Sequence, residues 1–178
     1  MSRVKISYFT DALCVWAYVS QVRMNELKAN FKDAVELDCR YFHVFGNVSK
    51  KMDSAWKESG GLPAYRQHVR EIVEKFGHVR LHEQTWKMEV PKSSMPAHLF
   101  LCAVRYVESS SACAPGSGDR AAWALREAFF HEGRDISREE VLLEVAESIG
   151  LPAGEIKDAI AAGAAHAALA EDLELART

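Results

Sequence analysis

The sequence lacks the features of membrane-embedded and exported proteins. No apolar run approaches the length that spans a bilayer. Met1-Ser2-Arg3 leads directly into an alternating segment from Val4 to Phe9, with no apolar leader that ends at small residues. The formal net charge of -3 gives no reason to expect nucleic acid or an anionic membrane as a partner. We therefore expect a cytoplasmic protein that binds neither.

Cysteine is also scarce, and its spacing excludes two kinds of site. The four cysteines are Cys14, Cys39, Cys102 and Cys113. They have neither the paired spacing of a structural zinc site nor the density of a disulfide framework. We expect no metal ion, and in a reducing cytosol we expect free thiols.

The first 45 residues predict a strand, a helix and a second strand. Val4 to Phe9 alternates with a period of two, and so does the segment from Val35 to Val44. Between them, Val15, Val19, Val22 and Leu27 have the spacing of one helical face that runs to about residue 29. Such a βαβ unit has parallel strands and a right-handed crossover.

The remainder of the chain predicts helices. Residues 46–64 are polar and predict an irregular connection, and 65–162 predict a helical insertion domain. Within this domain we expect helices over 65–76, 97–107 and 121–130, and a flexible loop over 109–119. A further helix should begin at a capping box that Ser137 and Glu140 form. Residues 163–178 predict a helix that leads back to the first part of the fold, with Gly163 as the break before it.

The predicted sheet is small. Two parallel strands make a poor sheet by themselves, and Leu173 to Thr178 stops inside a helical pattern. We therefore expect that C-terminal strands are missing from this chain. The first strand would then have an open edge, at which a homodimer could form.

The segment from Asp11 to Tyr18 lies between the first strand and the helix, and it contains Cys14. A thiolate in the first turn of a helix is stabilised by unpaired N–H groups and by the helix dipole. Such a position can lower a thiol pKa from about 8.5 to roughly 3.5–7.5. We expect Cys14 to be a nucleophile, and the alternative is a small buried side chain.

The same segment resembles the D-x-x-C-P-W-C stretch of the cytosolic branch of the DsbA-like family. Asp11, Cys14 and Trp16 match, whereas Val15 replaces the proline and Ala17 replaces the second cysteine. Three later segments are similar to family segments as well: Ser93 to His98, Ala128 to Ile136, and Gly163 to Ala176. The resemblance implies an α/β fold with a thioredoxin-like βαβ core and a large helical insertion. In the family a cis-proline turn, two strands and a helix come next, and this sequence ends before them.

The absent second cysteine changes the expected chemistry. In a dithiol protein the second cysteine resolves the mixed disulfide that the first one forms. Cys39 is predicted mid-strand, more than about 10 Å from the level of Cys14, which is too far for a disulfide. We therefore expect an enzyme that acts on a thiol or disulfide substrate through Cys14 alone. It would bind no cofactor tightly and would use glutathione or another thiol as co-substrate.

Two other functions stay open at this point. The related 2-hydroxychromene-2-carboxylate isomerases and kappa-class transferases imply a glutathione-dependent isomerase or transferase on the same scaffold. The third function is a non-catalytic binding protein that has kept the fold.

The remaining candidate residues each have a structural alternative. We expect Trp16 to shield the site, with Tyr18 as its neighbour in the motif. His43, at the end of the second strand, is a candidate base or substrate-binding group, or it packs at the strand end. His98 is a candidate substrate-binding residue, but its apolar surroundings favour the core. The spacing of His98 and Cys102 resembles a metal pair, yet two ligands do not make a site.

Overall fold

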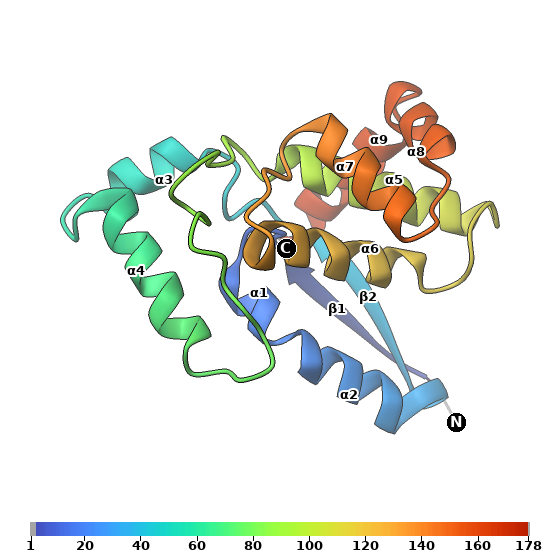
Figure 1. Ribbon diagram of the computed structural model, residues 1–178. Helices are drawn as coiled ribbons and strands as arrows, with labels where there is room; N and C mark the ends of the chain where they lie inside the picture. The colour runs from blue at the N-terminus through green and yellow to red at the C-terminus, as the bar shows by residue number, and fades with distance from the viewer. Residues whose placement is uncertain (1–2, 178) are drawn as a thin grey trace.

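The computed structural model describes residues 3–177, which form two strands, nine α-helices and two shorter helical turns (Figure 1). In chain order the elements are β1 (Val4–Thr10), α1 (Val15–Val19), α2 (Gln21–Phe31), a 3-10 turn (Lys32–Ala34), β2 (Val35–Tyr41), α3 (Val48–Ala55), α4 (Gly61–Val73), α5 (Met95–Ser109), α6 (Ser117–Arg126), a π-helical turn (Glu127–His131), α7 (Glu139–Ser148), α8 (Ala153–Ala161) and α9 (Ala164–Leu175). In the described part of the chain, no helix has both the length and the apolar character needed to cross a membrane.

The predicted βαβ unit is present. β1 and β2 pair in parallel, in a register that runs from Val4 opposite Val35 to Thr10 opposite Tyr41. The second strand was predicted to end at Val44, and this prediction was wrong, because the chain turns after Tyr41. There the N–H of Val44 donates to the carbonyl of Phe42 (3.0 Å) instead of extending the ladder. Within residues 3–177, no strand pairs with the other edge of β1.

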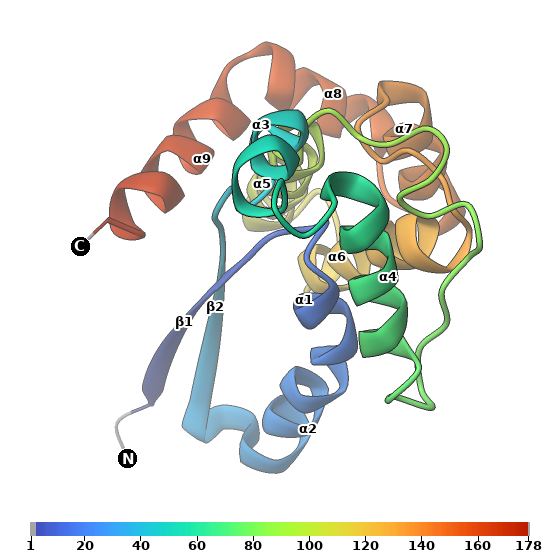
Figure 2. The same ribbon diagram turned by 90° about the vertical axis from the view of Figure 1, so that its left-hand side faces the viewer.

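The crossover contains two helices where one was predicted. α1 ends at Val19 and α2 begins after Ser20. Four of the five residues of α1 are buried, whereas α2 buries none, and Val22 of the predicted apolar face is 38% exposed. The two helices diverge because α1 packs into the core against α4, whereas α2 lies along β2. Figure 2 shows the strands and α2 extending away from the other helices.

Residues 46–64, after β2, were predicted to form an irregular connection, and this prediction was wrong. This segment contains α3 and the start of α4. Asn47 caps α3, since its side-chain oxygen accepts the N–H of Lys50 at 2.8 Å. Only Val48 and Met52 of α3 are buried, so the apolar pattern of this helix is short.

The helices predicted downstream are present with changed ends. α5 packs against α6, α8 and α9, which makes it the centre of the helical region. The predicted capping box was wrong, because α7 begins only at Glu139 and the Ser137 hydroxyl donates to the Asp135 carboxylate (2.6 Å). Gly163, with φ of 85°, does separate α8 from α9. The predicted domain limits at residues 45, 64 and 162 stay predictions.

A buried ion cluster that the sequence did not indicate joins α9 to the sheet and to α5. The Asp172 carboxylate is fully buried and accepts from Arg40 (2.9 Å), Arg105 (3.0 Å) and the Tyr41 N–H (3.0 Å). Removing one member of a buried pair leaves the other charge uncompensated. This carboxylate therefore holds α9 against β2 and α5.

Candidate functional site around Cys14

The turn between β1 and α1 is held by the side chain of Asp11. Its carboxylate is buried and accepts from the N–H of Leu13 (2.8 Å), the N–H of Phe45 (2.9 Å) and the hydroxyl of Ser94 (2.8 Å). The N–H of Cys14 donates to the Asp11 carbonyl at 3.1 Å. One aspartate thus connects the Cys14 turn with the segment after β2 and with the start of α5.

The Asp11 carboxylate can be buried beneath the turn because both of its oxygen atoms accept hydrogen bonds. Burial acts to raise the pKa of its carboxyl group, but His98 and the N–H groups of Phe45 and Leu13 outweigh that effect, and the pKa is lowered. Asp11 therefore stays ionised as an acceptor beneath the turn.

His98 completes the support of the turn from α5. Its Nε2 lies 3.1 Å from the Ala12 nitrogen and 3.5 Å from Asp11 Oδ1. The Nδ1 atom of His98 is buried and has no hydrogen-bond partner among the described residues. The His98 side chain is fully buried. It therefore positions the turn from below and has no surface to offer a substrate, contrary to one of the two predicted roles.

Cys14 is the N-cap residue of α1, with φ of -82° and ψ of 118°, and it is partly exposed. Its carbonyl accepts the N–H of Tyr18 at 3.2 Å. The next three N–H groups belong to the first turn of a helix, where they have no intrahelical acceptor. The Cys14 side chain makes no capping hydrogen bond to these N–H groups, and a negative sulfur there would be stabilised by the dipole of the helix start.

The motif neighbours of Cys14 have distinct surroundings. Tyr18 is buried, donates to the Arg80 carbonyl (3.1 Å) and stacks on Phe130 with ring centroids 4.7 Å apart. Ala17 is buried as well. Trp16, in contrast, is 54% exposed. The prediction that Trp16 shields the site by packing was therefore wrong, and its ring is available to a bound molecule.

The contacts of His43 do not connect this residue with the Cys14 turn. It follows the end of β2, is partly buried and stacks on Phe42 at 5.5 Å. Its Nδ1 is buried without a hydrogen-bond partner in the described residues. None of its hydrogen bonds or ring contacts there involves Cys14, so a role as base or substrate donor stays a prediction.

Ser94 is a site residue that the sequence reasoning missed. It lies four residues before His98, so both side chains face the Cys14 turn from the start of α5. That spacing was a usable signal, because Ser94 and His98 belong to one of the segments that resemble the family.

Comparison with known proteins decides the family. The family model of the DSBA-like thioredoxin domain matches residues 5–178. The chain belongs to this family. Comparison with curated protein sequences gives no match.

Solved structures of DSBA-like proteins share the fold. The cytosolic disulfide reductase DsbM from Pseudomonas aeruginosa superposes with a TM-score of 0.71 and 16% identity, over 95% of this chain and 76% of DsbM. The probable DsbA oxidoreductase from Streptomyces coelicolor gives a TM-score of 0.67 and 18% identity, over 98% of this chain and 75% of that one. At these identities the likeness establishes the thioredoxin-like fold with its helical insertion.

The other thiols of this DSBA-like chain are less suited to nucleophilic chemistry. All four cysteines are free. Burial raises the pKa of Cys39, against an opposing effect of Arg126, and burial raises the pKa of Cys102 to about 12. Cys113 lies partly buried in the loop before α6. Among residues 3–177, no cluster of metal-ligating side chains is present.

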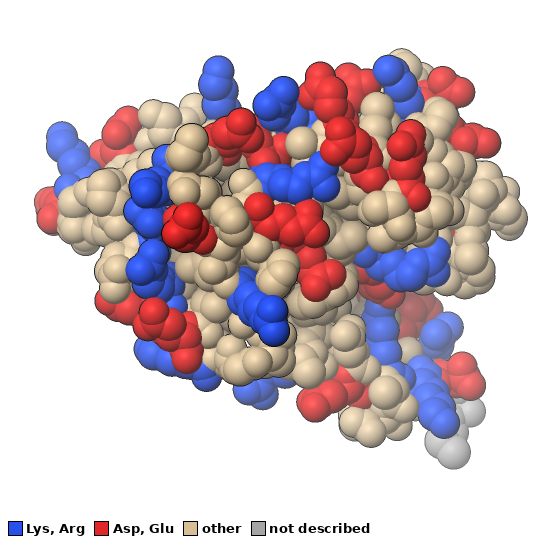
Figure 3. All heavy atoms as spheres, in the orientation of Figure 1, with Lys and Arg blue, Asp and Glu red and all other residues tan. Residues whose placement is uncertain are grey.

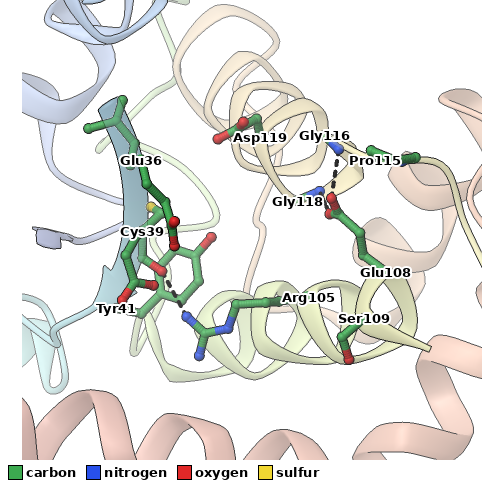
Figure 4. A pocket seen from close by; sticks show the side chains of 12 residues that line it. Glu36, Cys39, Tyr41, Arg105, Glu108, Ser109, Pro115, Gly116, Gly118 and Asp119 are labelled. Carbon is green, nitrogen blue, oxygen red and sulfur yellow. Dashed lines mark hydrogen bonds between the residues drawn. The ribbon is translucent and has the colours of Figure 1, made fainter. Parts of the chain in front are cut away.

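A cavity of about 440 Å³ lies between β2, α5 and the start of α6, and Cys14 is not among its lining residues (Figure 4). Its polar groups serve contacts within the protein. Arg105 donates to the Cys39 carbonyl (2.7 Å), and the Glu108 carboxylate accepts from the N–H groups of Gly116 and Gly118. We therefore place the functional site at the Cys14 turn and not in this cavity.

Proposed function

We propose that this DSBA-like protein is a thiol–disulfide oxidoreductase that works through the single thiol of Cys14. The observation that supports this most is the contrast among the thiols. Cys14 is partly exposed at a helix start whose backbone Asp11 fixes, whereas burial raises the pKa of Cys39 and of Cys102.

The reaction needs two thiols in turn. The Cys14 thiolate attacks one sulfur of a substrate disulfide, the S–S bond breaks, and the other sulfur leaves as a thiolate. A second thiolate then attacks the sulfur that is bonded to Cys14, forms a new disulfide with the bound group, and releases the Cys14 thiolate. One disulfide is thereby exchanged for another, and the protein is regenerated.

The second thiol should come from outside the chain. Ala17 is buried where the family has its second cysteine, so the motif itself offers no resolving sulfur. Glutathione is our proposed co-substrate, in a reducing compartment such as the cytosol, and we propose no tightly bound cofactor. Figure 3 shows positive and negative side chains interspersed on one face, which gives no support to a nucleic-acid partner.

A glutathione-dependent isomerase or transferase is the second candidate. It is favoured by the solved structure of DsbM with GSH, which superposes with a TM-score of 0.68 and 18% identity, over 95% of this chain and 77% of that one. In such an enzyme the glutathione sulfur would be the nucleophile, and Cys14 would be dispensable.

Mapping of glutathione adducts separates these functions. The reduced protein is incubated with glutathione disulfide, and its peptides are analysed by mass spectrometry. We expect the adduct on Cys14, its loss in Cys14→Ser, and its retention in the control Cys113→Ser. Adducts on the other cysteines alone would refute the proposal. Saturable glutathione binding that persists in Cys14→Ser would favour the isomerase or transferase. Neither adduct nor binding would favour a non-catalytic binding protein.

A further inference from the structure

Arg126, the last residue of α6, carries a buried positive charge. The residue is 2% exposed, and arginine is not deprotonated in proteins. Its guanidinium donates to Gln21 Oε1 (2.6 Å) and to Thr10 Oγ1 (3.0 Å), which are both neutral. Its Nε is buried without a hydrogen-bond partner in the part of the chain that the structure describes. No carboxylate of residues 3–177 forms an ion pair with it.

A buried charge of this kind normally has a partner of opposite charge, because removal from water is costly. Arg40 and Arg105 follow this rule in the same protein, since both donate to the buried carboxylate of Asp172. Arg126 has a free donor and lacks the counter-charge. The described residues therefore leave one requirement of this side chain unmet.

Arg126 lines a small pocket between β1, β2, α2 and α6. The pocket has a volume of about 20 Å³, which is enough for an occupant of about the size of one water molecule. Lys28 and Asp119 also line it, and they form an ion pair with each other while both side chains stay partly exposed. Tyr8 and Cys39 line it from the two strands.

The charges around the pocket leave one positive charge in excess. Lys28 and Asp119 neutralise each other, and the charge of Arg126 remains. Burial raises the pKa of Cys39, and Arg126 opposes this effect without outweighing it, so the thiol is neutral at pH 7. The missing negative charge must therefore come from outside these side chains.

We propose that this pocket binds one monovalent anion of about the size of chloride. The anion would accept from Arg126 Nε and supply the absent counter-charge. Because Arg126 also donates to Thr10, the residue before Asp11, the bound anion would stabilise the contact between α6 and the end of β1. The inference goes beyond the proposed function and does not depend on the chemistry of Cys14.

Urea unfolding of the full chain at increasing sodium chloride tests the proposal. Sodium gluconate, whose anion is too large for the pocket, keeps the ionic strength constant. An anion that binds the folded state alone stabilises it by mass action. Above its dissociation constant, each tenfold rise in chloride should therefore lower the unfolding equilibrium constant about tenfold. The line width of the chloride NMR signal, which broadens when chloride exchanges with a protein site, measures binding to the folded protein directly.

Gln21→Glu is the most informative variant, because it places a carboxylate where Gln21 Oε1 already accepts from Arg126. At the lowest chloride concentration we expect a higher urea midpoint than the parent's, and we expect the chloride effect to be lost. Arg126→Gln removes the positive charge and should lose the chloride effect as well. Gln67→Glu, on the exposed side of α4, changes the net charge equally and should keep the parent's response.

Equal urea midpoints and equal chloride line widths of the parent at all chloride concentrations would overturn the proposal, because water would then suffice for Arg126. A chloride effect that persists undiminished in Gln21→Glu would place the anion elsewhere and would also overturn it. If Arg126→Gln does not fold, Gln21→Glu decides. None of these outcomes concerns glutathione adducts of Cys14, so the proposed function stands or fails separately.

Discussion

Asp11→Asn should destabilise the protein measurably, because the carboxylate of Asp11 has more donors than an amide can serve. The carboxylate accepts from Leu13, Phe45 and Ser94 while fully buried. The asparagine side chain has one oxygen, so its NH2 group would face at least one of these donors. Hydrogen bonds to charged groups contribute about 1.5–3 kcal/mol each. With one or two of them lost, the free energy of unfolding should fall by about 2–4 kcal/mol.

Urea unfolding at pH 7, followed by fluorescence, measures this change, with Asp33→Asn on the exposed 3-10 turn as the control. Asp33→Asn should unfold at the parent's midpoint. A decrease below about 0.5 kcal/mol in Asp11→Asn would refute our account of how the Cys14 turn is held.

The pH dependence gives a second check on the same variant. The pKa of Asp11 is lowered in the folded protein from its ordinary value of 3.8. Its contribution to stability is therefore complete above pH of about 3.8 and is lost as the pH falls through the lower folded value. The difference between the parent and Asp11→Asn should shrink on acidification. A constant difference down to acid unfolding would contradict the assignment.

Three further changes test other parts of the structure. Asp172→Asn should lower the free energy of unfolding by about 3 kcal/mol, because Arg40 and Arg105 lose their buried counter-charge, and urea unfolding should detect it. Ala17→Cys should create a dithiol motif with Cys14 and raise insulin-reduction activity, whereas activity equal to the parent's would mean that a resolving thiol is not the only missing element. The open edge of β1, on which Val4 is 57% exposed, should pair with a second copy of the 178-residue chain. Light scattering should give a dimer mass that Ile6→Lys reduces, and a monomer mass at all concentrations would reject edge pairing.

The βαβ unit was predictable because its signals are local. Period-two alternation in Val4 to Phe9 needs no knowledge of distant residues, and the same is true of the apolar face of α5. The capping box at Ser137 failed because the N-cap of α7 is Arg138, one residue later, and the Ser137 side chain belongs to a turn with Asp135. The pattern S-x-x-E cannot show this shift of one residue.

α3 was missed because its buried face is only Val48 and Met52, too few to give a helical period. The single helix predicted for 15–29 had the right apolar spacing, but α1 and α2 pack against different partners. Packing of that kind depends on the whole fold, and the spacing of Val22 and Leu27 cannot reveal it.

The Cys14 site was also only partly predictable, because some of its contacts join residues that are far apart in the sequence. Cys14 and Asp11 were identified because they lie three residues apart in one motif. Ser94 and Asp172 act through contacts with residues far away in the chain, and a local pattern does not show these contacts. His98 was identified as a residue of interest, but only the structure distinguishes support of the turn from contact with a substrate.

The central claim is that Cys14 is the reactive thiol of this chain, and competition among the four thiols of the native protein tests it most directly. The folded, reduced protein is treated with less than one equivalent of iodoacetamide, and the label on each cysteine is quantified by mass spectrometry. We predict that Cys14 takes up most of the label and that Cys39 and Cys102, whose pKa values burial raises, take up the least. Label that gathers on Cys113, or that spreads evenly over the four cysteines, would contradict the account.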